Sequence, residues 1–230
     1  MKIANLASIA SVARRHGLIT IVDNTFMTPY WQRPLALGID LVVHSGTKYL
    51  GGHNDLLSGI VVTKTPELSE RMALIQKATG AVLSPSDSWL MLRSIKTLGL
   101  RLRQQEQNAL KIAGWLQEHP LVSQVYYPGL PDHPGHEIHR KQATGYGAVL
   151  SFKVRERRLV ERIINNVRVI SFAESLGGLE TLITYPAVQT HGDIPVEVRE
   201  RIGVTDDLLR LSVGIEDPDD LWEDLKQAIE

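Results

Sequence analysis

The sequence contains no cysteine among its 230 residues. This absence excludes disulfide bonds, thiolate metal sites and a cysteine nucleophile, and it fits a reducing compartment. The formal net charge is only −1, so the charge balance gives no indication of nucleic acid or an anionic membrane as a partner. No apolar run approaches the length of a membrane span, and no secretory signal is visible. These absences lead us to expect a soluble cytoplasmic protein.

The first hundred residues alternate between helical and strand-like patterns. Apolar side chains recur at helical spacing over residues 3–13, which predicts a helix. Three short and nearly all-apolar runs follow, at residues 18–24, 41–45 and 59–64. Such runs are typical of strands buried on both faces of a parallel sheet. The alternation therefore predicts an α/β domain in which helices cover the sheet.

The second half has a different pattern. Residues 86–119 are helical in character, and the polar stretch at 101–106 indicates either a solvated turn between two helices or one long bridging helix. After Pro120 the pattern predicts an α+β domain with an antiparallel sheet and helices on one face. Its expected strands are 122–128, 146–154, 167–172, 181–186 and 208–213, and its expected helices are 156–165, 195–202 and 217–229.

These patterns divide the chain into residues 1–105 and residues 106–230. Three buried strands are too few for a doubly wound sheet, and a crossover helix opens the chain with no strand before it. We therefore expect residues 1–105 to be the C-terminal portion of a larger domain whose N-terminal part is absent.

The segment VVHSGTKYLGGHND, residues 42–55, contains several side chains that can take part in catalysis or ligand binding. Ser45 and Thr47 place two hydroxyls next to Lys48, and hydroxyls with loop amides can hold a phosphate. A lysine in such a place can form an imine with an aldehyde cofactor. Asp23 ends an earlier strand, where a carboxylate can pair with a pyridinium nitrogen. Each feature alone is more often a polar turn or a cap, so the prediction depends on their combination.

Five phrases in this order closely resemble the Cys/Met-metabolism enzymes that depend on pyridoxal 5′-phosphate (PLP). They are VDNTFMTPYWQRPLALGIDLVVHSGTKYLGGHNDLLSG, PSDSWLMLRSIKTLGLRL, VYYPGLPDHPGHE, FAESLGGLETLITYPAVQTHGDIP and LLRLSVGIEDPDDLWEDL. The resemblance covers essentially the whole chain. It implies the fold-type I PLP-dependent transferase architecture, here a partial large cofactor domain followed by a C-terminal α+β domain. It also implies PLP as the cofactor and assembly into dimers of dimers.

The resemblance implies roles for the residues that would contact the cofactor. Lys48 resembles the Schiff-base lysine, and Asp23 resembles the partner of the pyridine nitrogen. Ser45 and Thr47 resemble the hydroxyls that help to hold the phosphate. Gly46 is often alanine in relatives and is expected to make this loop slightly more flexible.

The resemblance also implies a substrate site. Arg210 resembles the arginine that binds the substrate α-carboxylate, a task for which a bidentate guanidinium is better suited than a lysine. Ser175 resembles the residue beside the same carboxylate. Glu174 resembles a glutamate that can meet the distal amino group of cystathionine, although a solvated loop acid is the simpler interpretation. Thr190 is expected to support Arg210.

The implied activity is formation or cleavage of a C–S bond in transsulfuration and methionine metabolism. Glu174 and the phrase TYPAVQTH favour cystathionine γ-synthase, with cystathionine β-lyase close behind and methionine or cystathionine γ-lyase and O-acylhomoserine sulfhydrylase as further alternatives. The expected substrates are amino acids: cystathionine, cysteine or O-acylhomoserine. Because the family's phosphate loop, ring-stacking tyrosine and mobile arm have no counterpart here, a truncated fragment that folds and oligomerises without catalysis is a second hypothesis.

Two other motifs invite different interpretations. His133, His136 and His139 form an H-x-x-H-x-x-H pattern, but they lie in a Pro/Gly-rich stretch whose spacing does not converge on one helix face. We therefore expect no metal site. Gly51 and Gly52 do not form a dinucleotide fingerprint, because the G-x-G-x-x-G pattern between a strand and a helix is missing.

Overall fold

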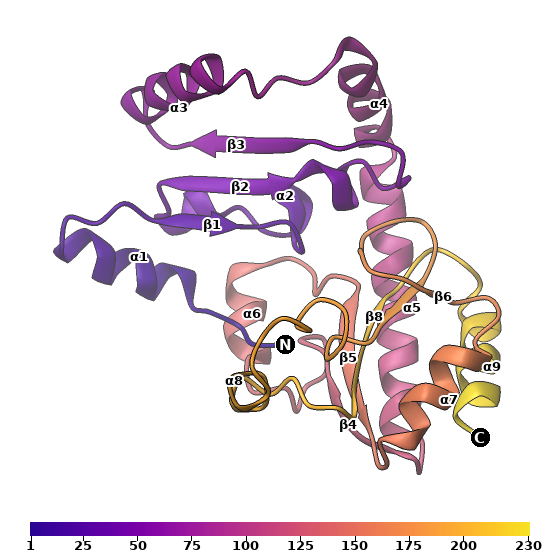
Figure 1. Cartoon of the computed structure of the whole chain (residues 1–230). Coiled ribbons are helices and arrows are strands. Elements are labelled where there is room, and N and C mark those ends of the chain that lie inside the picture. The colour runs from indigo at the N-terminus through magenta and orange to yellow at the C-terminus, as the bar shows by residue number, and fades with distance from the viewer. The chain divides into compact units, whose positions relative to one another are not determined.

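The computed structural model describes all residues, 1–230, and divides them into two compact units (Figure 1). The N-terminal unit comprises residues 2–100 and 135–146. The C-terminal unit comprises residues 101–134 and 147–230, together with Met1. Residues 135–146 were expected in the second domain, whereas in the structure they pack within the N-terminal unit.

The N-terminal unit contains a three-stranded sheet in the order β1-β2-β3. Strands β1 and β2 are parallel, as expected, but β3 runs antiparallel to β2. The expectation of a parallel third strand is wrong because residues 46–58 turn back at the end of β2 and pair Gly59 with Ser45, without the crossover that a parallel strand requires. The elements of this unit are α1 (Leu6–Arg15), β1 (Ile21–Asp23), α2 (Thr28–Trp31), β2 (Leu41–Ser45), β3 (Gly59–Thr63), α3 (Pro66–Thr79), α4 (Pro85–Ile95) and α6 (His136–Gln142), with a 3₁₀ turn η1 (Pro34–Leu37) and a wide helical turn η2 (Gly46–Leu50).

Burial in this sheet is uneven. The core of this unit contains Leu6 and Ala10 of α1, Ile39 just before β2 and Val42 within β2. The outer strands expose their branched side chains, and Ile21 of β1 retains 65% of its accessible surface. The expectation of strands buried on both faces therefore describes β2 but is wrong for β1 and β3.

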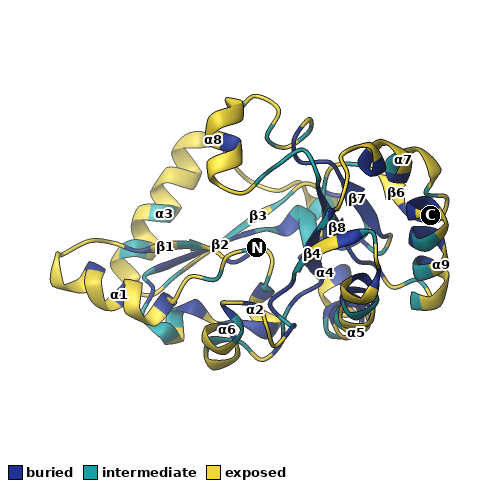
Figure 2. Ribbon diagram, turned by 90° about the horizontal axis from the view of Figure 1, so that it is seen from below, coloured by how far each residue is buried: buried dark blue, intermediate teal, exposed yellow.

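Helix α3 has no buried residue, and Figure 2 shows exposed positions along most of its length. Its ends are nonetheless well formed. Thr65 caps its N-terminus by accepting a hydrogen bond from Leu68 N–H, and Gly80 closes its C-terminus in the left-handed conformation. The helix is thus defined by local signals that do not depend on packing.

Helix α5 (Leu98–Glu118) is continuous. The solvated turn at 101–106 is therefore wrong, while a turn at residues 96–97 divides the helical stretch of 86–119 into α4 and α5 instead of leaving one long helix. Arg101 and Gln105 are buried, because they lie on the same face of the helix as the apolar positions. This face consists of Leu102, Ala109, Ile112, Ala113 and Leu116, none of which retains accessible surface.

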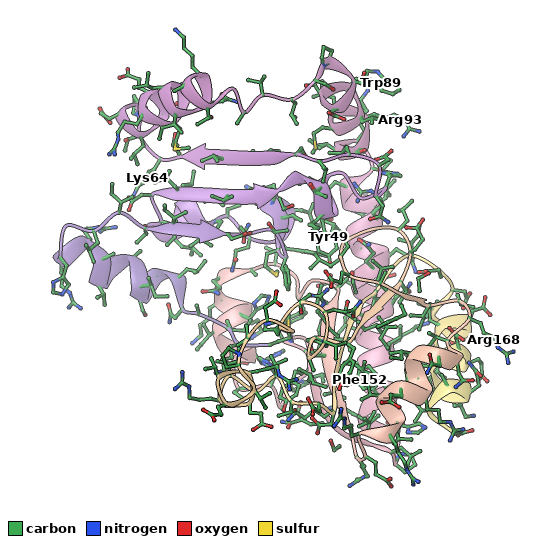
Figure 3. The ribbon with its side chains drawn as sticks, viewed as in Figure 1. Tyr49, Lys64, Trp89, Arg93, Phe152 and Arg168 are labelled. Carbon is green, nitrogen blue, oxygen red and sulfur yellow. The ribbon has the colours of Figure 1, made fainter.

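The C-terminal unit contains a five-stranded sheet in the order β4-β5-β8-β7-β6. The expected antiparallel pairing is confirmed for every neighbouring pair except β6 and β7, which are parallel. Buried side chains of the central strands, such as Phe152 and Leu211, form its core (Phe152 is labelled in Figure 3). The remaining elements are β4 (Val122–Tyr126), β5 (Val149–Val154), α7 (Arg158–Asn166), β6 (Ser171–Phe172), β7 (Leu182–Thr184), α8 (Val196–Arg201), β8 (Leu208–Ser212) and α9 (Pro218–Ile229).

A buried carboxylate joins α9 to the segment between α7 and β6. Asp224 accepts hydrogen bonds from the backbone N–H groups of Arg168, Val169 and Ile170, at 2.8–3.1 Å. Only 6% of Asp224 is exposed. In the folded protein these three backbone N–H groups therefore replace water as hydrogen-bond donors to the carboxylate. Such charge-assisted bonds are stronger than those between neutral groups.

We expect Asp224→Ala to lower the free energy of unfolding by about 2–4 kcal/mol, because it leaves these backbone donors without an acceptor. Chemical denaturation of the variant measures this loss. Glu223→Ala is the matched control, since Glu223 is the exposed neighbour on α9, and it should change stability by less than about 0.5 kcal/mol. Equal effects from the two substitutions would contradict the anchoring role of Asp224.

Candidate active site

Two of the predicted site residues end neighbouring parallel strands. Asp23 is the last residue of β1, and Ser45 is the last residue of β2. The register pairs Asp23 with Val43, so the carboxyl ends of both strands meet at one edge of the sheet. This edge is the usual place for a ligand in an α/β sheet. Asp23 is exposed there and Ser45 is partly buried.

Thr25 connects these two strand ends. Its hydroxyl donates to Asp23 Oδ1 at 2.6 Å, and its backbone N–H donates to the same oxygen at 2.9 Å. The Ser45 N–H in turn donates to Thr25 Oγ1 at 2.8 Å. Thr25 therefore fixes the direction of the Asp23 carboxylate and its distance from the β2 end. Thr25 was not among the predicted site residues, although an acid followed two residues later by a threonine is a recognisable local turn pattern.

The loop after β2 is held to the start of β3. Gly46 N–H donates to Ser58 O at 2.8 Å, and Ser58 N–H donates to Thr47 Oγ1 at 3.1 Å. The Thr47 hydroxyl in turn donates a longer bond to Ser58 O at 3.4 Å, while the Ser45 hydroxyl makes no hydrogen bond within the chain. The Ser45 hydroxyl can therefore donate directly to a ligand, whereas the Thr47 hydroxyl can do so only by exchanging its long bond to Ser58 O.

Gly46 contributes close packing rather than flexibility. A Cβ atom at this position would overlap Ser58 Oγ and would lie 2.7 Å from Met91 Cε. Gly46 is buried, and Ser58 Oγ beside it is buried without a hydrogen-bond partner. The expected gain in flexibility is therefore not the main consequence of a glycine here, because the neighbouring side chains occupy the space of a methyl group.

Lys48 lies at a bend in the turn η2. Its backbone departs from helical geometry, with φ −88° and ψ −128°, and its side chain is partly buried. Gly52 N–H donates to Lys48 O at 2.7 Å, while Tyr49, the next residue, is fully buried (Figure 3). The Tyr49 ring packs edge-on against Trp31 with centroids 6.4 Å apart. Lys48 therefore extends from a rigid base.

The segment that follows Asp23 is rigid as well. Asn24 is buried, and its side-chain amide donates to Thr28 O and Gln32 O, each at 3.0 Å. These bonds close residues 24–32 into a compact loop. Thr28, also buried, adopts a left-handed conformation with φ +56°, which a non-glycine residue keeps only where its surroundings impose it.

His44 occupies the opposite face of β2 from Ser45, because side chains alternate along a strand. It is 4% exposed. Burial lowers the pKa of His44 below its ordinary value of 6.5, and the Asp23 charge and a backbone hydrogen bond to Asn24 partly oppose this effect. His44 is therefore neutral in the folded protein at neutral pH.

This depressed pKa predicts a pH dependence of stability. As the pH falls below about 6.5, the unfolded chain binds a proton at this position before the folded chain does, so the free energy of unfolding decreases. We expect His44→Gln to weaken this decrease between pH 7.5 and pH 5, as measured by chemical denaturation. His16→Gln, at an exposed histidine, should leave the pH dependence unchanged. A His44→Gln curve parallel to that of the unmodified protein would contradict the prediction.

The C-terminal unit brings Arg210 and Ser175 together. Arg210 lies on β8, and its Nη2 donates to Ser175 O and to Thr184 Oγ1, each at 3.0 Å. Ser175 has φ +109°, an uncommon conformation for a residue with a side chain. Glu174, its neighbour, is exposed. Thr184, whose hydroxyl contacts Arg210, was not among the predicted site residues.

Thr190 lies elsewhere in the same unit. It is exposed, and its hydroxyl is 2.8 Å from His191 Nδ1. The predicted residues thus fall into two sets, one in each unit. Asp23, Ser45, Thr47 and Lys48 belong to the N-terminal unit, and Glu174, Ser175, Thr190 and Arg210 belong to the C-terminal unit.

The histidine motif has a structural explanation. His136 and His139 both stack on Tyr146, with centroids 5.3 and 5.7 Å apart, and His139 Nε2 lies 2.8 Å from Gly145 O. No group of three or more histidine, cysteine or acidic side chains is arranged to hold a metal ion. None of the helices combines the length and the apolar character needed to cross a membrane.

The family model described as Cys/Met metabolism PLP-dependent enzyme matches residues 1–230. The chain belongs to this family, as its motifs predicted. It is 51% identical over 230 residues to a cystathionine γ-lyase of Bacillus subtilis (strain 168), and 50% identical over 230 residues to a cystathionine β-lyase of Lactococcus lactis subsp. cremoris (strain MG1363). In both cases the alignment covers all of this chain and 61% and 60% of the relative, respectively.

Solved structures give the same result. The crystal structure of a cystathionine γ-lyase from Lactobacillus plantarum, complexed with L-serine, matches with a TM-score of 0.96 and 47% identity. A cystathionine γ-synthase from Xanthomonas oryzae pv. oryzae, in complex with cystathionine, matches with a TM-score of 0.96 and 43% identity. These matches cover 99% of this chain and 60% and 59% of the other chains, respectively. The α/β fold of fold-type I PLP enzymes is thereby confirmed, and the chain spans about 60% of the length of its relatives.

Proposed function

We propose that this protein binds PLP through Lys48 and makes or breaks a C–S bond in a sulfur-containing amino acid. The observation that carries this proposal is the convergence of Asp23, Ser45 and the Lys48 turn at one edge of the sheet, linked by Thr25. Family membership supplies the cofactor class. PLP, when bound, supplies an aldehyde that condenses with amines and a ring that accepts the electron pair released at the substrate α-carbon.

The residues of the N-terminal unit suit this cofactor. The donor set combines two hydroxyls for a phosphate, a carboxylate for a protonated ring nitrogen and a lysine for the aldehyde. In the proposed reaction the Asp23 carboxylate keeps the ring nitrogen protonated, and Ser45 and Thr47 donate hydrogen bonds to the phosphate. Lys48 would hold the aldehyde of the cofactor, and its amine would move a proton between the substrate α-carbon and a neighbouring carbon.

The residues of the C-terminal unit are proposed to bind the substrate. Arg210 binds the α-carboxylate, with Ser175 beside it. Glu174 is exposed and can accept a hydrogen bond from the distal ammonium group of a longer amino acid. Thr190 is assigned a weaker supporting role on the loop after β7.

Cystathionine is the substrate or product that we propose first. Relatives at about 50% identity include a γ-lyase, a β-lyase and a protein named cystathionine γ-synthase/O-acetylhomoserine (thiol)-lyase. Identity alone therefore does not separate these reactions, and we keep γ-synthase ahead of β-lyase because of Glu174. Assembly into dimers of dimers and a cytoplasmic location are further parts of the proposal.

A second candidate function is association without catalysis by residues 1–230 alone. It is favoured by the apolar side chains that β1 and β3 expose at the two outer positions of the sheet, such as Val61 and Val62 at 42% and 41%. Apolar edges of this kind bind further chains or aggregate.

The proposed function is tested by loading the purified protein with PLP. Borohydride reduction should attach the cofactor covalently, and peptide mapping should locate it on Lys48. Product analysis then separates the reactions: cleavage of cystathionine at its β-carbon releases homocysteine, cleavage at its γ-carbon releases cysteine, and the synthase consumes cysteine. A protein that associates but binds no PLP and yields none of these products would establish the second candidate instead.

Arg210→Lys tests the carboxylate site. The substitution keeps the positive charge but loses the planar pair of donors, so KM for amino-acid substrates should rise at least about thirtyfold, corresponding to ~2 kcal/mol. Steady-state kinetics measure the change. Arg168→Lys is the control, because Arg168 is exposed and points to solvent (Figure 3). An unchanged KM in Arg210→Lys would make Arg210 a structural residue.

A further inference from the structure

Thr184 is a buried residue whose hydroxyl makes two defined hydrogen bonds. It is the last residue of β7 and pairs with Arg210 in the register between β7 and β8. Its Oγ1 accepts a hydrogen bond from Arg210 Nη2 at 3.0 Å and donates one to Ala173 O at 2.9 Å. A hydroxyl has a single proton, so the bond to Ala173 directs its lone pairs toward the guanidinium. Only 1% of Thr184 is exposed, so a ligand does not reach it.

The segment that Thr184 contacts contains Ser175. Arg210 Nη2 also donates to Ser175 O at 3.0 Å, and Ala173 N–H donates to Ile183 O at 3.1 Å. Thr184 and Arg210 are thus bound to the backbone on both sides of Glu174. The buried Thr184 hydroxyl consequently ties Arg210 to Ala173, two residues before Ser175, while Arg210 itself bonds the Ser175 carbonyl.

The far end of this segment is tethered independently. Gly177 N–H donates to Ser212 Oγ at 2.9 Å, and the buried side chain of Gln105 donates to Gly178 O at 2.6 Å. The conformation of Ser175, at φ +109°, persists only because its surroundings impose it. Residues 173–178 therefore form a preorganised loop in the free protein.

We propose that Thr184 is a positioning residue that sets the direction of the Arg210 guanidinium relative to Ser175, and so makes the site selective for ligands with an α-carboxylate. The proposal deepens the proposed function, since it rests on the binding of a carboxylate by Arg210. A guanidinium discriminates best when its donors match the plane of the carboxylate. Loss of the Thr184 acceptor removes one of the contacts that orient the guanidinium and so reduces that match.

The test compares two amines that differ by a carboxylate. L-Serine and ethanolamine share an amine and a hydroxyl, and their affinities for the PLP-loaded protein are measured from the change in cofactor absorbance. The ratio of the two affinities reports carboxylate selectivity. A purely structural effect of a substitution changes both affinities equally and leaves the ratio unchanged.

We expect Thr184→Val to lower this ratio about tenfold, equivalent to about 1.4 kcal/mol, and Thr184→Ser to restore it. Thr181→Val is the matched control. Thr181 is a fully buried threonine beside β7 whose hydroxyl contacts Glu216 and Gly214 instead of Arg210. It should reduce stability without changing the ratio. If Thr184→Val does not fold, Thr184→Cys replaces it, because a thiol is a weak hydrogen-bonding group of similar size.

The outcomes separate the inference from the function on which it rests. If Arg210→Lys lowers the ratio while Thr184→Val and Thr184→Cys leave it unchanged, the positioning role is wrong and the substrate site stands. If Arg210→Lys also leaves the ratio unchanged, Arg210 does not bind the carboxylate and both assignments fail. Failure of Thr184→Ser to restore the ratio would likewise overturn the role of the hydroxyl.

Discussion

Lys48→Ala is expected to abolish covalent attachment of PLP and to reduce turnover at least about a thousandfold. The substitution removes both the amine that holds the aldehyde and the base that moves the α-proton, and general base catalysis alone contributes about 10²–10⁴-fold. The fold should survive, because the turn is closed by backbone bonds from Gly51 to Gly46 and from Gly52 to Lys48, which alanine retains. Absorbance after borohydride reduction, turnover and thermal unfolding measure the three effects.

Lys64→Ala provides the comparison for Lys48. Lys64 is an exposed lysine of the same unit and follows β3 directly (Figure 3), so its loss should leave cofactor attachment and turnover intact. If Lys48→Ala keeps a borohydride-reducible cofactor, or if Lys64→Ala loses it, the assignment of the cofactor lysine is wrong.

Asp23→Asn is expected to keep most of the cofactor and to lose at least about a hundredfold in kcat. The asparagine oxygen can still accept the two hydrogen bonds from Thr25, so the side chain keeps its place while its charge is lost. A neutral amide does not hold a proton on the ring nitrogen, and removal of one preorganised electrostatic partner typically costs about 2.7–4 kcal/mol of transition-state stabilisation. Cofactor stoichiometry and kcat are measured on the same preparation.

Asp40→Asn separates an effect on turnover from one on stability. Asp40 accepts hydrogen bonds from the backbone and hydroxyl of Thr20, at 2.9 and 2.8 Å, and these bonds hold its pKa below the usual value. Its substitution should weaken the fold and spare kcat. If Asp23→Asn retains a near-normal kcat that equals or exceeds the kcat of Asp40→Asn, Asp23 has no electronic role in the reaction.

The sequence predicted the elements of the fold better than their arrangement. The apolar run at 59–64 predicted a strand, but the predicted strand direction was wrong because periodicity does not encode which way a strand runs. The sequence also left open whether residues 101–106 form a turn or part of a helix, because polar residues there suggested exposure to solvent. The polar residues Gln105 and Asn108 of helix α5 are buried because they bond backbone carbonyls of Gly178 and Gly214, far away in the sequence.

The residues of the candidate site also differ in whether they could be predicted from the sequence. Lys48 and Asp23 could be singled out from the sequence because each stands next to an apolar run within a distinctive motif. Thr25 was missed although its signal is local, since it is separated from Asp23 by one residue. Thr184 has no local signal at all. Its contact with Arg210 exists only because β7 and β8 pair in one particular register.

The sequence by itself determined the PLP-dependent family and indicated the candidate site residues, because these depend on residue identity and short spacings. Only the tertiary structure decided which hydroxyl meets Arg210, which residue orients Asp23 and which polar side chains are buried. Those contacts join positions distant in the chain, and they form only when sheet pairing and core packing bring the positions within hydrogen-bonding distance.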